Sequence, residues 1–143
     1  MSRLRAWHLL PILVLATFLW CAFIWVLYVH RAVRVVRDTL SPDGNRDAML
    51  MVINAGATDG YVTAVSIAPL YIPFGRQLTI LKRQRDFVID DNDGAVALVG
   101  AGQIPVDLQW NSNTDLTVQF PSKVRTIRQE GSNGPVSLHY RPK

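Results

Sequence analysis

The sequence predicts an N-terminal transmembrane α-helix followed by a small mainly-β domain, arranged as an antiparallel sandwich or a curled sheet. Two observations carry this prediction. The stretch from Leu9 to Val29 contains twenty-one consecutive residues without a charge, and a helix of that length matches a bilayer core of about 30 Å. From Ser41 onward, short runs of β-branched and aromatic residues alternate with turn residues, which is typical of strands. We therefore expect a membrane anchor helix with basic flanks over residues 1–38 and a soluble β domain over residues 39–143.

Aromatic and basic residues flank the apolar stretch where membrane interfaces are expected. Trp and Tyr rings favour the head-group level, and arginines beside a bilayer attract anionic head groups at about 1 kcal/mol each. The predicted membrane-anchor residues are Trp7, Trp25, Tyr28, Arg31, Arg34 and Arg37. We expect the helix to continue to about Asp38. The basic residues on the two sides nearly balance, so charge alone does not set the orientation of the span.

Cys21 is the only cysteine of the chain, so no disulfide can form within it. Trp20 precedes it, where a signal peptidase needs a small side chain, so we expect an uncleaved anchor instead of a lipid-modified cysteine. Thr17 and Cys21 also form a pair of small residues one helical turn apart, which favours close approach of another helix. The expected partners are therefore the lipid bilayer and, as an alternative, another membrane protein.

The net charge of +4 does not indicate a nucleic-acid partner. Five arginines flank the apolar stretch, whereas residues 38–143 hold ten Lys or Arg against eleven Asp or Glu. The excess of positive charge is thus a property of the segment beside the membrane.

Turn residues divide the second part of the chain into candidate strands. Ser41–Gly44 and Asn111–Thr114 have the composition of tight turns, and Ala55–Gly60 is a glycine-containing hairpin connection. The predicted strands are Ala48–Asn54, Tyr61–Ala68, Leu78–Leu81, Phe87–Ile89, Pro105–Trp110, Leu116–Phe120, Val124–Gln129 and Val136–Tyr140.

The residues available for chemistry do not favour catalysis, and we expect no cofactor and no metal site. Residues 38–143 contain one histidine, His139, and no cysteine, so neither a Cys–His pair nor a typical zinc site can be assembled. The Asp90–Gly94 cluster has oxygen ligands that suit calcium, but Ile89 and Gly100 occupy two ligand positions of the calcium-loop pattern. A solvated turn is the favoured interpretation of that cluster.

Two groups of residues are candidates for an interaction site. Thr58, Asp59 and Tyr61 belong to the glycine-containing hairpin, and the competing interpretation is that they form the turn while Tyr61 packs in the core. Lys82, Arg83 and Arg85 form a basic run that suits an acidic partner or anionic head groups. Its alternative is a solvated strand edge protected against aggregation.

The segments Ser41–Gly44 and Gly56–Ile67 resemble a family of small bacterial envelope proteins of unknown function, many with lipoprotein signals. The likeness extends loosely to Asp91–Gly94, Val106, Trp110 and Val136–Tyr140. This chain differs in having an apolar span instead of a lipid-modified cysteine, and one glycine instead of two at Ala55-Gly56. The resemblance implies a membrane-tethered domain on the periplasmic side of a bacterial inner membrane, and it implies no activity.

Together these observations predict a single-pass membrane-anchored β domain that acts as a non-catalytic binding or interaction module at the bacterial cell envelope. The alternative is an accessory subunit of a larger membrane protein complex, docked through its transmembrane helix. An enzyme ranks third, because no spacing of carboxylates, histidines or nucleophiles selects a reaction.

Overall fold

The computed structural model describes residues 6–54, 61–82, 84–100 and 102–143, and within the N-terminal helix it describes the side chains of residues 11–25. The chain divides into two compact units, Met1–Arg31 and Ala32–Lys143. Below, the second of these is called the β unit.

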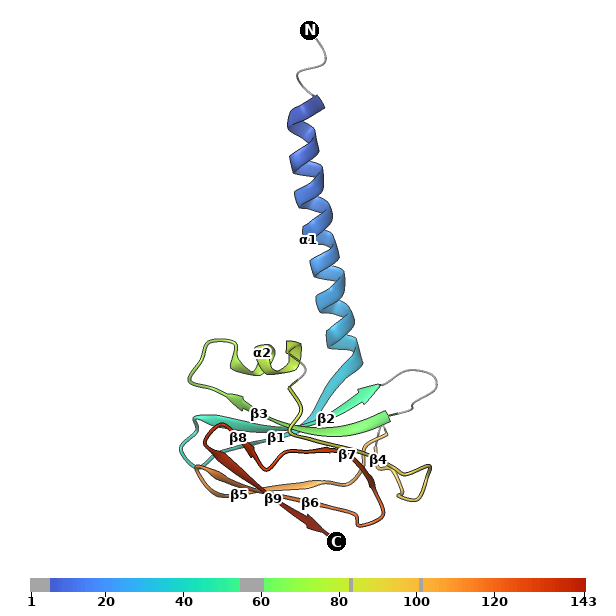
Figure 1. Ribbon diagram of the computed structural model, residues 1–143, viewed down its shortest axis with the longest axis vertical. Coiled ribbons are helices and arrows are strands. Elements are labelled where there is room, and N and C mark those ends of the chain that lie inside the picture. Colours follow the sequence, from blue (N-terminus) through green and yellow to red (C-terminus); the bar gives the residue numbers. More distant parts are fainter. Residues whose placement is uncertain (1–5, 55–60, 83, 101) are drawn as a thin grey trace. The chain divides into compact units, whose positions relative to one another are not determined.

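The first unit is built on helix α1 (Ala6–Ala32) (Figure 1). Every side chain from residue 11 to residue 25 is exposed, and none of them carries a charge. The hydroxyl of Thr17 donates to the carbonyl oxygen of Leu13 at 2.7 Å, which satisfies this polar group within the helix. The described part of α1 therefore presents an apolar surface on all sides.

The structure corrects the expectation of a transmembrane helix. In the part of the chain that the structure describes, no helix has both the length and the apolar character that a membrane crossing requires. The prediction of a transmembrane helix is therefore wrong. Of its proposed anchor residues, Trp25 is exposed on α1, while the side chains of Trp7, Tyr28 and Arg31 lie outside the described residues.

The helix also ends earlier than expected. Residues Val33–Leu40 form strand β1, which pairs antiparallel with β2 (Arg46–Asn54). The three valines of this segment are β-branched and favour an extended backbone, and pairing with β2 supplies the hydrogen bonds that a continued helix would otherwise make. Arg34 and Arg37 are consequently exposed strand residues, and Arg37 forms an ion pair with Asp107 at 3.2 Å.

The β unit contains two sheets in its described residues (Figure 1). The five-stranded sheet has the order β1-β2-β3-β4-β7, and the four-stranded sheet has the order β5-β6-β9-β8. The remaining strands are β3 (Tyr61–Pro69), β4 (Phe87–Asp90), β5 (Asp107–Ser112), β6 (Asp115–Phe120), β7 (Arg125–Gln129), β8 (Ser132–Asn133) and β9 (Val136–Pro142). The prediction of a β-rich domain is confirmed, but the pairing is not antiparallel throughout, because β6 and β9 run parallel.

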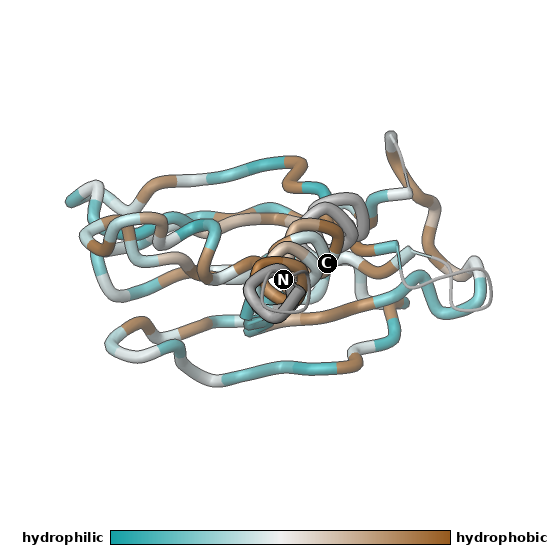
Figure 2. The backbone as a smooth tube through the Cα atoms, turned by 90° about the horizontal axis from the view of Figure 1, so that it is seen from above, coloured by the Kyte–Doolittle hydropathy of each residue, from teal (hydrophilic) through white to brown (hydrophobic). Residues whose placement is uncertain are grey.

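The core joins residues of both sheets. Leu50 and Val65 of the five-stranded sheet and Leu116 and Val118 of the four-stranded sheet are fully buried in one cluster. The ring of Phe87 belongs to the same cluster, with its centroid 4.9 Å from that of Phe120. Apolar and polar segments alternate along the backbone (Figure 2), as expected for strands with one face in the core.

A short helix, α2 (Gly75–Leu81), covers part of the opposite face of the five-stranded sheet. Ile80 of α2 packs on a second buried cluster that includes Met49 and Met51 of β2, and Val33 packs on the same cluster. Residues Leu78–Leu81 were expected to be a strand, because their apolar and β-branched run has no helical period. The sequence signal was too short to separate the two structures.

The turn at Ser41–Gly44 forms as predicted. The amide of Gly44 donates to the carbonyl oxygen of Ser41 at 2.8 Å, and Gly44 has a φ of +69°. The carboxylate of Asp43 accepts hydrogen bonds from the Ser41 hydroxyl at 2.6 Å and from the Asn45 amide at 3.1 Å. These bonds, the Ser41 bond above all, lower the pKa of Asp43 to about 2.

Candidate interaction surface

The predicted glycine-loop site is described only in part. Thr58 and Asp59 lie outside the described residues. Tyr61 begins β3 and is 48% exposed. Its ring lies against Gly102, where an added Cβ would come within 2.8 Å of the tyrosine Cδ2 atom. The ring therefore covers a glycine backbone at the surface instead of entering the core, and an interaction role for Tyr61 stays a prediction.

The basic run does not form one exposed patch among its described members. Lys82 is the exposed C-cap residue of α2, whereas Arg85 is only 8% exposed and donates to the carbonyl oxygen of Gln84 at 2.8 Å. Arg83 lies outside the described residues. Lys82 and Arg85 therefore do not share one exposed surface, because Lys82 is exposed and Arg85 is buried.

The acidic cluster is an ordered turn whose buried carboxylate has a cationic partner. Asp90 accepts hydrogen bonds from the Asn92 amide at 2.9 Å and from Nε of Arg125 at 2.8 Å. Asn92 and Asp93 both have positive φ, which turns the chain back toward the domain. Among the residues that the structure describes, no group of three His, Cys, Asp or Glu side chains could hold a metal ion.

His139 lies at the surface of the four-stranded sheet. Its Nε2 atom is 3.0 Å from the Asp115 carboxylate, and both side chains are substantially exposed. This contact joins β9 to β6.

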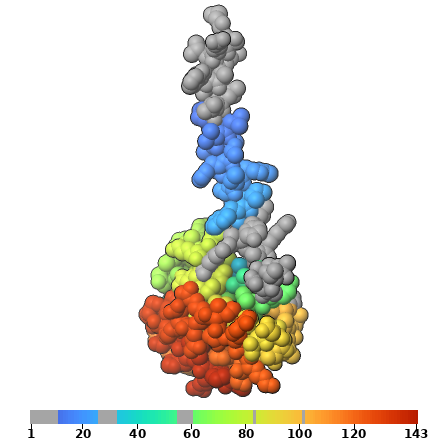
Figure 3. Space-filling view, turned by 45° about the vertical axis from the view of Figure 1, so that its right-hand side comes forward, coloured from blue at the N-terminus to red at the C-terminus, as the bar shows by residue number. Residues whose placement is uncertain are grey.

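An exposed apolar surface lies on and before α2, and sequence analysis did not find it. We call it the α2 patch, and its residues are Leu70, Tyr71, Ile72, Phe74 and Leu78. Tyr71 is 67% exposed and Phe74 is 76% exposed. Figure 3 shows this segment in yellow-green on the surface of the β unit. The available signal was a run of large apolar residues interrupted by Pro73, which has neither a helical nor a strand period.

An ion-pair network holds α2 on the sheet. Nε of Arg76 is 2.5 Å from the fully buried carboxylate of Asp47, and Arg76 also pairs with Asp38 of β1. Neither carboxylate oxygen of Asp47 has a well-oriented hydrogen-bond partner, so the contact with Arg76 is mainly one of charge. Burial raises the pKa of Asp47, and the Arg76 charge offsets part of that rise.

A second buried polar cluster joins the two sheets. Asp86 accepts hydrogen bonds from the Ile67 amide and from the Asn133 side chain, both at 2.9 Å. The Tyr140 hydroxyl donates to the carbonyl oxygen of Glu130 at 2.6 Å. Burial raises the pKa of Asp86, which the Asn133 hydrogen bond partly opposes. These bonds connect β3 and β4 with β8 and β9, so we assign the cluster to the stability of the domain.

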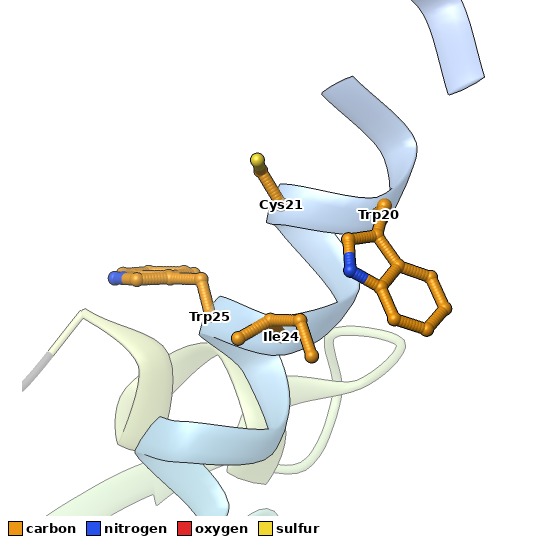
Figure 4. Close-up of a pocket in the computed structure, with 4 residues that line it drawn as sticks. All are labelled: Trp20, Cys21, Ile24 and Trp25. Carbon is orange, nitrogen blue, oxygen red and sulfur yellow. The ribbon is translucent and has the colours of Figure 1, made fainter. Parts of the chain in front are cut away.

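The described part of α1 carries a shallow apolar hollow of its own, lined by Trp20, Cys21, Ile24 and Trp25. Trp25 and Cys21 point to one side of the helix and Trp20 to the other, with Ile24 between them (Figure 4). All four side chains belong to α1, so the hollow is a feature of the helix surface.

No family model matches the chain, and no curated protein or solved structure matches it either. The protein is therefore described by its structure alone, as a two-sheet β unit and an apolar helix that both have exposed apolar surface. In the described residues, the buried carboxylates of Asp47, Asp86 and Asp90 face arginine or asparagine side chains.

Proposed function

We propose that this chain is a non-catalytic interaction module of the bacterial envelope, held at a lipid bilayer through the apolar surface of α1. One observation carries the proposal: all described side chains of α1, residues 11–25, are uncharged and exposed. Large exposed apolar surfaces mark interaction sites in proteins, and a helix that is apolar on all sides requires apolar surroundings. The envelope location rests on the resemblance of Ser41–Gly44 and Gly56–Ile67 to envelope proteins.

The polar groups of the β unit support a role without catalysis. Asp47 and Asp90, which are buried, each face an arginine, and Asp86 is bonded to Asn133. The exposed His139 faces Asp115. Each of these groups therefore has a structural partner.

Flotation of the full chain with vesicles of phosphatidylcholine and phosphatidylglycerol tests the proposal. We expect the chain to float, and we expect Leu15→Lys to reduce the floating fraction. That substitution removes apolar contact worth about 2 kcal/mol and places a charge in the binding surface.

Ile127→Lys is a matched control. Leu15 and Ile127 are 59% and 57% exposed, so the two substitutions differ in location and not in burial. The control variant should float like the unaltered chain. A chain that does not float, or equal losses in both variants, would contradict the proposal.

A second candidate is an accessory subunit whose α1 packs against helices of a partner protein. The apolar hollow beside Cys21 favours it, because such a hollow can receive a partner side chain. Native mass measurement after detergent extraction separates the candidates. A stoichiometric complex would support the subunit, and a monomer would count against it.

A further inference from the structure

The α2 patch presents its side chains outward on a segment whose backbone is tightly constrained. Phe74 has a φ of +59°, a left-handed conformation that is unfavourable for a bulky residue, and its ring is 76% exposed. Pro69 and Pro73 restrict the backbone before it. At Gly75, an added Cβ would overlap the carbonyl oxygen of Pro69, so α2 begins in close contact with the end of β3. The backbone of the patch is therefore constrained, and its aromatic rings are exposed.

The chemistry of this segment suits the interface of an anionic bilayer. Tyr71 and Phe74 supply aromatic rings, which favour the region between acyl chains and head groups. Residues 69–82 contain no acidic residue. Of their two basic residues, Arg76 is paired with Asp38 and Asp47, so we assign the contact with lipid phosphates to Lys82. Lys82 is exposed at the C-terminal end of α2, where a cation can reach lipid phosphates. Both the apolar and the charged parts are thus complementary to such a surface.

The chain enters the β unit on the same face. Val33, the first residue of β1, packs on the methionine cluster that Ile80 of α2 also covers. The preceding residue, Ala32, is the last of α1. The residue at which the chain enters the β unit therefore packs on the same cluster as α2.

We propose that the α2 patch is a second lipid-binding surface, which inserts Tyr71 and Phe74 among the head groups of an anionic bilayer. This inference rests on the proposed function, since it assigns to the β unit a contact with the same membrane. It adds that the domain binds the bilayer through a defined face and is not merely tethered to it.

Site-specific fluorescence in the full chain tests this inference. Cys21→Ser removes the only cysteine of the sequence, after which Tyr71→Cys or Leu78→Cys provides a unique site for an environment-sensitive nitrobenzoxadiazole label. With vesicles of phosphatidylcholine and phosphatidylglycerol, we expect a blue shift of the emission and a loss of quenching by aqueous iodide. The effect should be weaker on pure phosphatidylcholine, and Lys82→Glu should weaken it on the anionic vesicles.

Ser122→Cys in the same background is the matched control. Ser122 is exposed in the turn after β6, which belongs to the other sheet. Its label should keep its emission and its iodide quenching. Equal protection at residues 71 and 122 would overturn the proposal, because it would indicate adsorption or aggregation of the whole domain.

The same samples separate this inference from the proposed function. If the chain floats but labels at residues 71 and 78 stay quenched by iodide, the α2 patch does not bind lipid and the proposed function still stands. If the labelled chain does not float, both fail. Protection that is as strong on pure phosphatidylcholine would contradict the anionic specificity.

Discussion

Gly75 allows α2 to begin directly against the end of β3. An added Cβ at this position would overlap the carbonyl oxygen of Pro69, which is backbone and cannot turn aside. We expect Gly75→Ala to lower the free energy of unfolding by about 2 kcal/mol or more, since either α2 or the strand end must move. Chemical denaturation followed by the fluorescence of Trp110 in the β unit measures the change.

Gly131 provides the matched control for that substitution. It has no atom within 4 Å of an added Cβ. Gly131→Ala should therefore leave the free energy of unfolding nearly unchanged. A similar loss in both variants would mean that steric overlap at Pro69 is not the cause.

Single residues also show where sequence reasoning succeeds. The turn composition of Ser41–Gly44 correctly predicted a tight turn, because proline, aspartate and glycine act there through local bonds. The pairing of Arg76 with Asp47 could not be predicted. These residues are distant in sequence, and only the packing of α2 on β2 brings their charges together.

At the scale of elements, α2 depends on one arginine for its polar attachment. Arg76→Ala would leave the buried Asp47 without its counter-charge. We expect a loss of about 2–3 kcal/mol in the free energy of unfolding, less than for a wholly buried pair because Arg76 is partly exposed. Gln77→Ala, on the exposed surface of the same helix, should cost little. Equal effects of the two variants in thermal denaturation would argue against the ion pair.

Strands marked by apolar runs between turn residues could be predicted, and elements without such a signal could not. β2, β3, β6 and β9 lie close to the expected strands, because buried apolar runs bounded by turn residues identify them. The residues of β1 were expected to be helical up to about Asp38, because arginines at every third position resemble one face of a helix. The α2 patch escaped notice because exposure of apolar side chains depends on the folded backbone and leaves no periodic pattern.

At the scale of the whole molecule, buried and exposed carboxylates make opposite contributions to the dependence of stability on pH. Burial raises the pKa of Asp86, as it does that of Asp47, so the folded state binds a proton at these groups more tightly than the unfolded state. That contribution is present at low pH and is lost as the pH rises through the raised pKa. Asp43 behaves oppositely, because its pKa is lowered from 3.8 to about 2. Its ionised form stabilises the fold above pH 3.8, and this contribution is lost as the pH falls from 3.8 to about 2.

We therefore expect the free energy of unfolding to be greatest at mildly acidic pH and to fall below about pH 4. Urea denaturation across the pH range measures this profile. Asp86→Asn should reduce the increase in the free energy of unfolding between neutral and mildly acidic pH. Asp43→Asn should reduce its decrease below about pH 4. A stability that increases steadily from pH 5 to neutral would contradict the assignment to Asp86.

The parallel pairing of β6 with β9 has a consequence for synthesis on the ribosome. β9 lies between β6 and β8, and its residues Val136 and Leu138 complete the core. Until the nascent chain has emerged as far as β9, β6 retains an unpaired edge and Val118 lacks part of its cover. Such an edge is a template for wrong pairing. Chaperone binding to the newly made chain should therefore end only after the Val136–Pro142 segment has left the exit tunnel.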